Sequence, residues 1–231
     1  FINPESAVAA LGFLNEYHRN QRMLLQVPEP LATQSQPDIS GARLIIEGAL
    51  SERRQLLSAL ETRALLHAFR IPMVPALMAR SPNEALSAAE CLGFPVALKI
   101  LSPDIAHKTD VDGVWLNIDP AERVRHAYNA LMARVRAWNP DARLEGVMVE
   151  KMYHSRNGRE LLLGIVNDPT FGPVISFGAG GTAVEILYDR AVALPPLNEQ
   201  IAETLIQQTR ISRWLGAWRN QPPVAQNALI Q

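Results

Sequence analysis

The sequence predicts an α/β fold made of two subdomains. Capped helical patterns alternate with apolar runs of strand length in the first part of the chain, whereas closely spaced strand patterns follow from Gly146 onward. Alternation of this kind is typical of a mixed α/β layer rather than of a helical bundle or a sandwich. The change in pattern predicts an N-terminal subdomain over residues 43–148 and a C-terminal subdomain over residues 149–231.

Composition limits the kinds of partner that the protein can have. The 22 basic and 23 acidic residues nearly cancel and form no block of like charge, which argues against nucleic acid or an anionic membrane as a general partner. The single cysteine, Cys91, cannot form an internal disulfide, and its helical surroundings predict a buried thiol. No apolar run of about 18 residues and no signal-peptide pattern is present, so we expect a cytoplasmic protein.

The first elements are a helix and a linker. Asn3 and Pro4 begin a helical pattern that runs over residues 3–19. Residues 20–42 contain three prolines and a polar stretch without periodicity, which predicts a linker. We therefore assign the first helix to a domain that precedes the others, or to their surface.

A second helix is predicted over residues 52–69, entered through Ser51. Residues 71–75 contain two prolines, which favour an extended edge strand. The segment Ser81-Pro82-Asn83-Glu84 then predicts a capped helix that ends at Gly93.

The segment from Phe94 to Val114 places Lys99 in the middle of an apolar strand pattern and continues into a polar loop. A cation inside a strand needs a carboxylate or an anionic ligand as its partner, because burying an unpaired ammonium group is costly. The loop is rich in donors and ends at Gly113, so strand and loop together are suited to cover a phosphate group. The alternative is a lysine that reaches into water beside an ordinary hairpin loop.

The remaining pattern predicts one helix, a β-meander and a closing helix. Residues 119–122 form a second capping-box pattern before a helix that ends near Trp138, and the arginines of this helix are interpreted as a solvated surface. Strands are predicted over residues 147–152, 160–166, 173–177 and 182–187, with a final helix over residues 199–215.

Two further features suggest chemistry. Glu150, Lys151 and Met152 end a strand at the joint between the subdomains, where ligands commonly bind, and Glu160 follows the next turn. Together they are interpreted as an adenosine site, with a solvated strand end as the alternative. The glycine-rich tetrapeptide over residues 178–181 allows consecutive amides to face an anion, although it also suits a plain turn.

His107 is the one histidine of five that lies in a loop dense with polar groups. An imidazole in such a loop can accept a phosphoryl group or donate to a phosphate, and the alternative is a surface imidazole with one loop hydrogen bond. The other histidines show no metal-ligand spacing, and no nucleophilic serine or cysteine motif is present.

Four segments together resemble a known family. They are GFPVALKILSPDIAHKTDVDGV, GVMVEKM, GRELLLGIVNDPTFGPVISFGAGGTAVE and DRAVALPPL, and in order and spacing they are similar to the ATP-grasp domain of the nucleoside-diphosphate-forming (ADP-forming) acyl-CoA synthetases. The resemblance covers about residues 50–223. The first helix is similar to the end of the CoA-ligase domain that precedes in fused members, so residues 1–42 are expected to be that end plus a linker. DRAVALPPLN resembles the subgroup fused to a GNAT acetyltransferase, the bacterial protein lysine acetyltransferases.

The resemblance implies an ATP-grasp fold with a nucleotide cleft between the two subdomains. The implied reaction converts acid, CoA and ATP into acyl-CoA, ADP and phosphate through an acyl phosphate and a phosphohistidine relay. The implied cofactors are ATP/ADP and Mg²⁺, and the implied partners are a CoA-binding ligase domain with a phosphohistidine loop and a fused GNAT domain.

The resemblance also implies roles for individual residues. Lys99 would neutralise the ATP phosphates, and His107 would take the phosphoryl group. The hinge that reads adenine by backbone groups would be Glu150, Lys151 and Met152, and Glu160 would hold the ribose. The residues facing the phosphates and the partner loop would be Lys108, Gly113, Gly178, Gly180 and Gly181.

The chain departs from the family pattern at three places. Asp112-Gly113 stands where two glycines are usual, and Arg70 stands where one is usual. The family's Asp-Ile-Asn-Pro-like segment, which helps to bind magnesium, would lie beyond Gln231, so the resemblance implies an incomplete C-terminal subdomain without assigned metal ligands. We therefore expect this fragment to bind nucleotide at most, without turnover on its own. The alternative function is a catalytically lapsed regulatory domain of a GNAT lysine acetyltransferase.

Overall fold

The computed structural model describes residues 3–25, 36–153, 155, 157–181 and 188–230. Two compact units are present, Ser35–His154 on the one hand and Phe1–Gln34 with Ser155–Gln231 on the other. The predicted subdomain boundary at residues 148 and 149 falls inside a strand of the first unit. The predicted strand over residues 182–187, part of the predicted linker, and His154 and Arg156 of the predicted turn lie outside the described residues.

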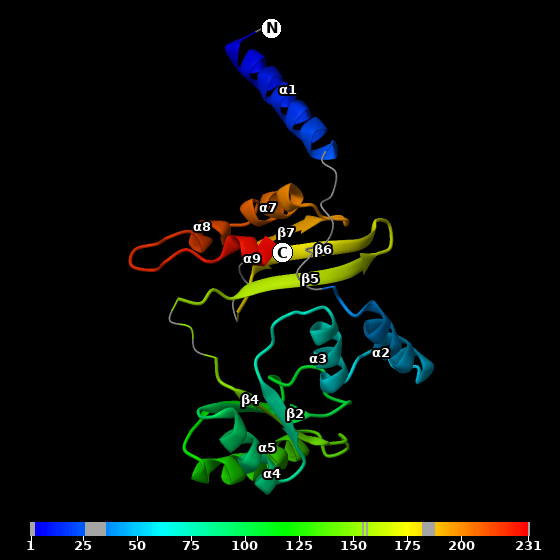
Figure 1. The fold of residues 1–231 in the computed structure, drawn as a ribbon, viewed down its shortest axis with the longest axis vertical. Helices are drawn as coiled ribbons and strands as arrows, with labels where there is room; N and C mark the ends of the chain where they lie inside the picture. Colours follow the sequence, from blue (N-terminus) through cyan, green and yellow to red (C-terminus); the bar gives the residue numbers. More distant parts are fainter. Residues whose placement is uncertain (1–2, 26–35, 154, 156, 182–187, 231) are drawn as a thin grey trace. The chain divides into compact units, whose positions relative to one another are not determined.

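The unit Ser35–His154 is a four-stranded antiparallel sheet with helices on it (Figure 1). The strand order is β1-β4-β2-β3. The strands are β1 (Ala76–Ala79), β2 (Val96–Leu101), β3 (Val114–Ile118) and β4 (Gly146–Lys151). The helices are α2 (Ile39–Ser51), α3 (Ala59–Ala68), α4 (Pro82–Leu92) and α5 (Glu122–Trp138).

The core of this unit lies between the sheet and helices α4 and α5. Leu98 and Ile100 of β2 and Val149 of β4 are fully buried in one cluster with apolar residues of both helices. Because side chains alternate across a strand, Lys99 and Glu150 project from the opposite face of the sheet. The same alternation that buries the core therefore places both charged groups on one surface.

Several predicted elements of this unit are confirmed. The apolar strand predicted around Lys99 is present as β2, and α4 begins at the Ser81 cap and ends at Gly93, whose φ is +82°. The predicted edge strand lies a few residues later, as β1. Cys91 is exposed on α4, so the prediction of a buried thiol was wrong.

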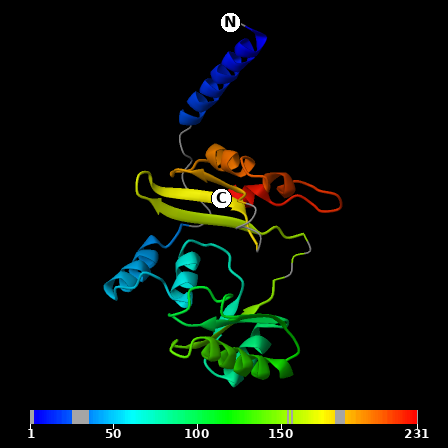
Figure 2. The same ribbon diagram turned by 180° about the vertical axis from the view of Figure 1, so that it is seen from behind.

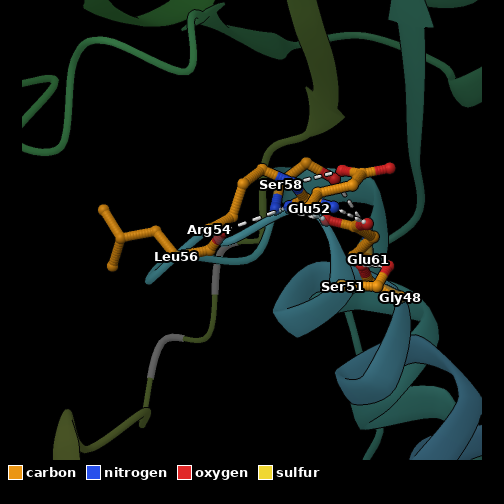
Figure 3. A network of polar contacts seen from close by, with 7 residues as sticks. All are labelled: Gly48, Ser51, Glu52, Arg54, Leu56, Ser58 and Glu61. Carbon is orange, nitrogen blue, oxygen red and sulfur yellow. Dashed lines mark hydrogen bonds and ion pairs between the residues drawn. The ribbon is translucent and has the colours of Figure 1, made fainter.

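The predicted start of the second helix at Ser51 was wrong, because α2 ends there. The chain reverses after it, and α3 begins with a reciprocal capping box between Ser58 and Glu61. Arg54 stabilises this turn by ion pairs of 2.6 Å to both Glu52 and Glu61 (Figure 3). The predicted linker over residues 20–42 likewise overlaps two helices, α1 (Pro4–Leu24) and α2. The capping box predicted before α5 is absent, since Ala121 occupies the cap with no side-chain hydrogen bond.

The other unit contains a three-stranded antiparallel sheet in the order β5-β6-β7, seen from behind in Figure 2. Its strands are β5 (Leu161–Asp168), β6 (Gly172–Ala179) and β7 (Arg190–Ala193), and its further helices are α7 (Glu199–Gln207), α8 (Ser212–Leu215) and α9 (Gln226–Ile230). Phe177, Ala191, Leu205 and Leu215 belong to its core. The meander is confirmed for β5 and β6, but β4, which was predicted to belong to it, pairs with β1 and β2 in the first unit.

The predicted helix over residues 199–215 is interrupted between α7 and α8. The Asp189 carboxylate accepts hydrogen bonds from the backbone N–H groups of Arg210 and Ile211, at 2.6 and 2.7 Å. These bonds offer the amides a partner other than a helical carbonyl group, so the helix is broken here by a tertiary contact.

Helix α1 begins at the predicted cap, because Asn3 accepts a hydrogen bond from the amide of Ser6 at 2.8 Å. Its large apolar side chains are exposed, with Phe13 at 72% and Val8 at 69%. Over the described part of the chain, no helix has both the length and the apolar character needed to cross a membrane.

Candidate functional site

Lys99 has a protein carboxylate as its partner. Its Nζ atom lies 2.6 Å from Oε2 of Glu150, and the two side chains are 35% and 20% exposed. Lys99 is opposite Met148 and Glu150 is opposite Ala97, so the pair is diagonal across strands β2 and β4, within reach of two long side chains. Of the partners predicted for this lysine, the structure therefore contains the carboxylate, and the pair remains accessible from solvent.

The strand end that carries Glu150, Lys151 and Met152 is held by main-chain contacts. The amide of Lys151 donates to the carbonyl group of Pro75 and that of Met152 to the carbonyl group of Pro95, both at 3.1 Å. Both N–H groups are thus engaged within the unit. A base that binds here would meet carbonyl groups and side chains rather than these two donors.

Gly113 closes the polar loop that follows β2. Its amide donates to the carbonyl group of Lys108 at 2.7 Å, and its carbonyl group accepts from Ile100 at 2.8 Å. A Cβ atom at Gly113 would lie 2.6 Å from Cγ2 of Ile100, so only glycine fits without movement. The glycine therefore sets the loop shape, which leaves Lys108 half-buried and His107 exposed.

The beginning of the same loop is fixed by Asp104. Its carboxylate accepts bonds from the backbone and the guanidinium group of Arg143, the shortest at 2.6 Å. The Arg143 hydrogen bonds lower the pKa of Asp104 from 3.8 to about 2. His107 thus lies on a loop that is attached at both ends.

The two departures from the family glycines both occur in left-handed backbone. Asp112 has a φ of +53° and Arg70 a φ of +58°. Asp112 also forms an ion pair with Arg134 of α5, with 2.6 Å between Nε and Oδ2. The Asp112 carboxylate is therefore paired with a cation of its own unit.

In the other unit, Glu160 lies against the glycine-rich segment. The amide of Gly180 donates to the carbonyl group of Glu160 at 2.8 Å, and Gly181 has a φ of +84°. Gly178 serves a different purpose, because a Cβ atom there would lie 2.0 Å from the main-chain oxygen of Asp189. It permits the close approach of the chain before β7, which is a packing role.

Glu160, Gly180 and Gly181 line a pocket of about 570 Å³. Segments 158–160 and 179–181 form part of its wall, and Asp189, Arg210, Ile211 and Trp214 complete it. Reasoning from the sequence gave these last four residues no role. Asp189 could have been found from the sequence, because it begins the family-like segment DRAVALPPL. Arg210 and Trp214 could not, because they lie in a pattern that predicts one continuous helix.

The predicted site residues divide between the two units. The first carries Lys99, His107, Lys108, Gly113, Glu150, Lys151 and Met152, and the second carries Glu160, Gly178, Gly180 and Gly181. Across the residues that the structure describes, no group of three or more histidine, cysteine or acidic side chains is placed to hold a metal ion.

Comparison with known proteins agrees with these features. A family model described as an ATP-grasp domain matches residues 48–231. The beta subunit of acetate–CoA ligase (ADP-forming) I from Pyrococcus furiosus is 37% identical over 83% of this chain and 81% of that subunit. The acetate–CoA ligase (ADP-forming) I of Archaeoglobus fulgidus is 34% identical over 99% of this chain, which spans 32% of that longer protein.

Solved structures support the same assignment. The dinucleotide-forming acetyl-coenzyme A synthetase 1 of Ca. Korarchaeum cryptofilum, solved with coenzyme A and Ca-AMPCP, has a TM-score of 0.77 and 35% identity, with 82% of each chain covered. A Pyrococcus horikoshii protein, PH1788, has a TM-score of 0.76 and 34% identity over 83% of this chain and 80% of that chain. The chain belongs to the ATP-grasp domains of the ADP-forming acyl-CoA synthetase family, in the portion that corresponds to their beta subunit.

Proposed function

We propose that this chain binds ATP and transfers its terminal phosphoryl group during ADP-forming acyl-CoA synthesis from an acid and CoA. The observation that carries the proposal is the solvent-accessible ion pair of Lys99 and Glu150 at the end of strand β4. An ammonium group held in this way is oriented before the nucleotide arrives, and phosphoryl transfer depends mostly on such positioning and charge neutralisation.

In this proposal Lys99 neutralises the phosphates, while Glu150, Lys151 and Met152 contact the adenine. Glu160 accepts hydrogen bonds from the ribose hydroxyl groups, and the loop of Lys108 and Gly113 together with Gly180 and Gly181 surrounds the phosphates. Gly178, with its packing role, acts indirectly by holding this segment in place.

His107 is the proposed acceptor of the phosphoryl group. One imidazole nitrogen attacks the terminal phosphorus of ATP, a P–N bond forms, the P–O bond to ADP breaks, and ADP leaves. Its exposure on a loop attached through Asp104 and Gly113 supports this role, since an acceptor must be reachable and positioned. In one structure of the Korarchaeum synthetase a phosphohistidine segment points towards the nucleotide-binding site, and we propose an equivalent ligase-domain partner here.

Magnesium is bound with the nucleotide in that relative. The described residues of this chain form no metal-binding group by themselves, so we assign no residue to the ion and no step to it. Mg²⁺ commonly reaches such sites on the phosphates with one or two carboxylates as ligands.

The acid substrate is proposed to be acetate. Relatives are named as ligases for acetate and for 4-hydroxybutyrate, and another as a trans-feruloyl-CoA synthase. The proposed site residues contact the phosphates and the nucleoside rather than the acid, so acetate is the first acid to test on the full-length protein.

A second candidate function is a regulatory domain of a GNAT lysine acetyltransferase in the cytoplasm, with lapsed synthetase chemistry. The segment DRAVALPPLN supports it by resemblance. A phosphorylatable histidine in the adjoining ligase domain would favour the synthetase, whereas its loss together with a GNAT domain would favour the regulator.

Calorimetric titration of the full-length protein with ATP and magnesium tests the main proposal. Lys99→Ala should weaken binding at least about ten-fold, Lys99→Arg should retain part of it, and Arg125→Ala on the surface of α5 should not change it. The proposal would be contradicted if ATP did not bind, or if the Lys99→Ala variant bound ATP as tightly as the unaltered protein.

A further inference from the structure

Arg210 is a cation in the pocket around Glu160 whose guanidinium group has no partner among the described residues. Arg159, by contrast, donates to the carbonyl groups of Trp214, Asn157 and Pro222. Its guanidinium carbon also lies 5.9 Å from the centre of the Trp214 ring. Arg159 is therefore part of the wall, and Arg210 is the positive group left available to a ligand.

The main chain of Arg210 is held in place even though its side chain is exposed. Asp189 accepts the amide hydrogens of Arg210 and Ile211 at 2.6 and 2.7 Å, and bonds to an ionised carboxylate are among the stronger ones. Ile211 is 8% exposed and packs in the core of the unit. The backbone that carries the Arg210 side chain is thus fixed by the Asp189 carboxylate and by the buried Ile211 next to it.

The same pocket also carries an available negative group. Glu160 is exposed, and in the described structure it forms no ion pair with Arg210 although both line the same space of about 570 Å³. That volume is in the range of small-molecule sites. The Glu160 carboxylate and the Arg210 guanidinium group share the pocket without pairing. A matching ligand would donate hydroxyl groups to the carboxylate and present an anionic group to the guanidinium.

We propose that Arg210 binds a phosphate group of the nucleotide in this pocket and that Asp189 positions it. A guanidinium group matches phosphate oxygens in a two-pronged geometry, which an exposed arginine on a fixed backbone can provide. The proposal rests on the proposed function, since it takes Glu160, Gly180 and Gly181 as part of the nucleotide site.

The test compares Arg210→Gln with Arg213→Gln, an exposed arginine of α8 outside the pocket. Calorimetry on the full-length protein should show ATP binding weakened about ten-fold or more by Arg210→Gln and unchanged by Arg213→Gln. Adenosine, which lacks phosphate, should bind both variants as it binds the unaltered protein. Arg210→Lys should restore part of the loss, which a folding defect at this position would not do.

A second readout separates this proposal from the function on which it rests. In ¹⁵N NMR, pyrophosphate should shift the amides of Gly180 and Gly181 and the side chain of Arg210, and Arg210→Gln should abolish the glycine shifts. If ATP binds in a Lys99-dependent way but Arg210→Gln equals Arg213→Gln, the role of Arg210 is wrong and the nucleotide site stands. If ATP does not bind at all, the pyrophosphate experiment alone tests whether the pocket binds an anion. The absence of chemical-shift changes would then overturn the anion site as well.

Discussion

The carboxylate of Glu160 occupies the space beside Gly181 that a side chain would need. A Cβ atom on Gly181 would lie 2.3 Å from Oε2 of Glu160. The placement of the proposed ribose ligand thus depends on the absence of a side chain at a residue that lies 21 positions later in the chain.

Gly181→Ala should therefore weaken nucleotide binding as well as folding. Alanine in left-handed backbone costs about 1–2 kcal/mol, and the flexible Glu160 side chain can move away from the new methyl group. ATP affinity should fall several-fold by calorimetry, with adenosine affected as much as ATP because the change is at the ribose.

Gly172→Ala is the matched control for this change. Gly172 also has a positive φ, of +75°, but a Cβ atom there would have nothing within 4 Å. Gly172→Ala should lower the melting temperature about as much as Gly181→Ala does, and it should leave ATP affinity unchanged. Equal losses of ATP affinity in the two variants would show that strain, rather than Glu160, causes the effect.

Arg70→Gly should stabilise the protein. The φ of +58° at Arg70 costs about 1–2 kcal/mol in a residue with a side chain, and the gain is partly offset by the greater chain entropy of unfolded glycine. The melting temperature should rise by about 1–3 °C. Arg70→Ala removes the same charge but keeps the Cβ atom. A higher melting temperature in both variants would therefore mean that loss of the charge, and not relief of backbone strain, is responsible.

Acid should weaken the turn between α2 and α3. Hydrogen bonds from Arg54 lower the pKa of Glu61 from 4.5 to about 2 in the folded protein. Since this pKa is depressed, the stabilisation is complete above pH 4.5 and is lost progressively as pH falls toward 2. Urea unfolding followed between pH 5 and pH 2 should show a smaller loss of stability in Glu61→Gln than in the unaltered protein.

Glu47→Gln provides the comparison for the acid experiment. Glu47 is exposed on α2 and forms no ion pair in the described part of the chain. Its replacement should leave the pH dependence of unfolding as it was. If both variants flatten the curve equally, the Arg54 network is not the source of the acid sensitivity.

Lysine labelling can test the phosphate site directly, because Lys99, Lys108 and Lys151 are the only lysines in the sequence. Saturating ATP should slow acetylation of Lys99 by an amine-reactive reagent, read by mass spectrometry, because the ammonium group then contacts phosphate. Adenosine should give no protection of Lys99. A labelling rate at Lys99 that does not respond to ATP would contradict its proposed role.

The sequence by itself determined the local elements and the chemistry that they carry. Strand β2 was predictable because its apolar run is bounded by clear turn signals, and α4 because serine, proline and glycine mark its ends. The family assignment followed from four motifs in order, and the sequence also picked out Lys99, whose charge stands out in an apolar strand.

Only the tertiary structure decided which of these groups meet. Glu150 became the partner of Lys99 because β4 pairs with β2, a long-range pairing that periodicity cannot encode and that the prediction of a meander had missed. Asp189 likewise divides a helix that looks continuous in sequence, since a carboxylate 21 residues away competes for the amide of Arg210. Local patterns fix what each segment can form, whereas contacts between distant segments fix which charges face each other and where a helix must stop.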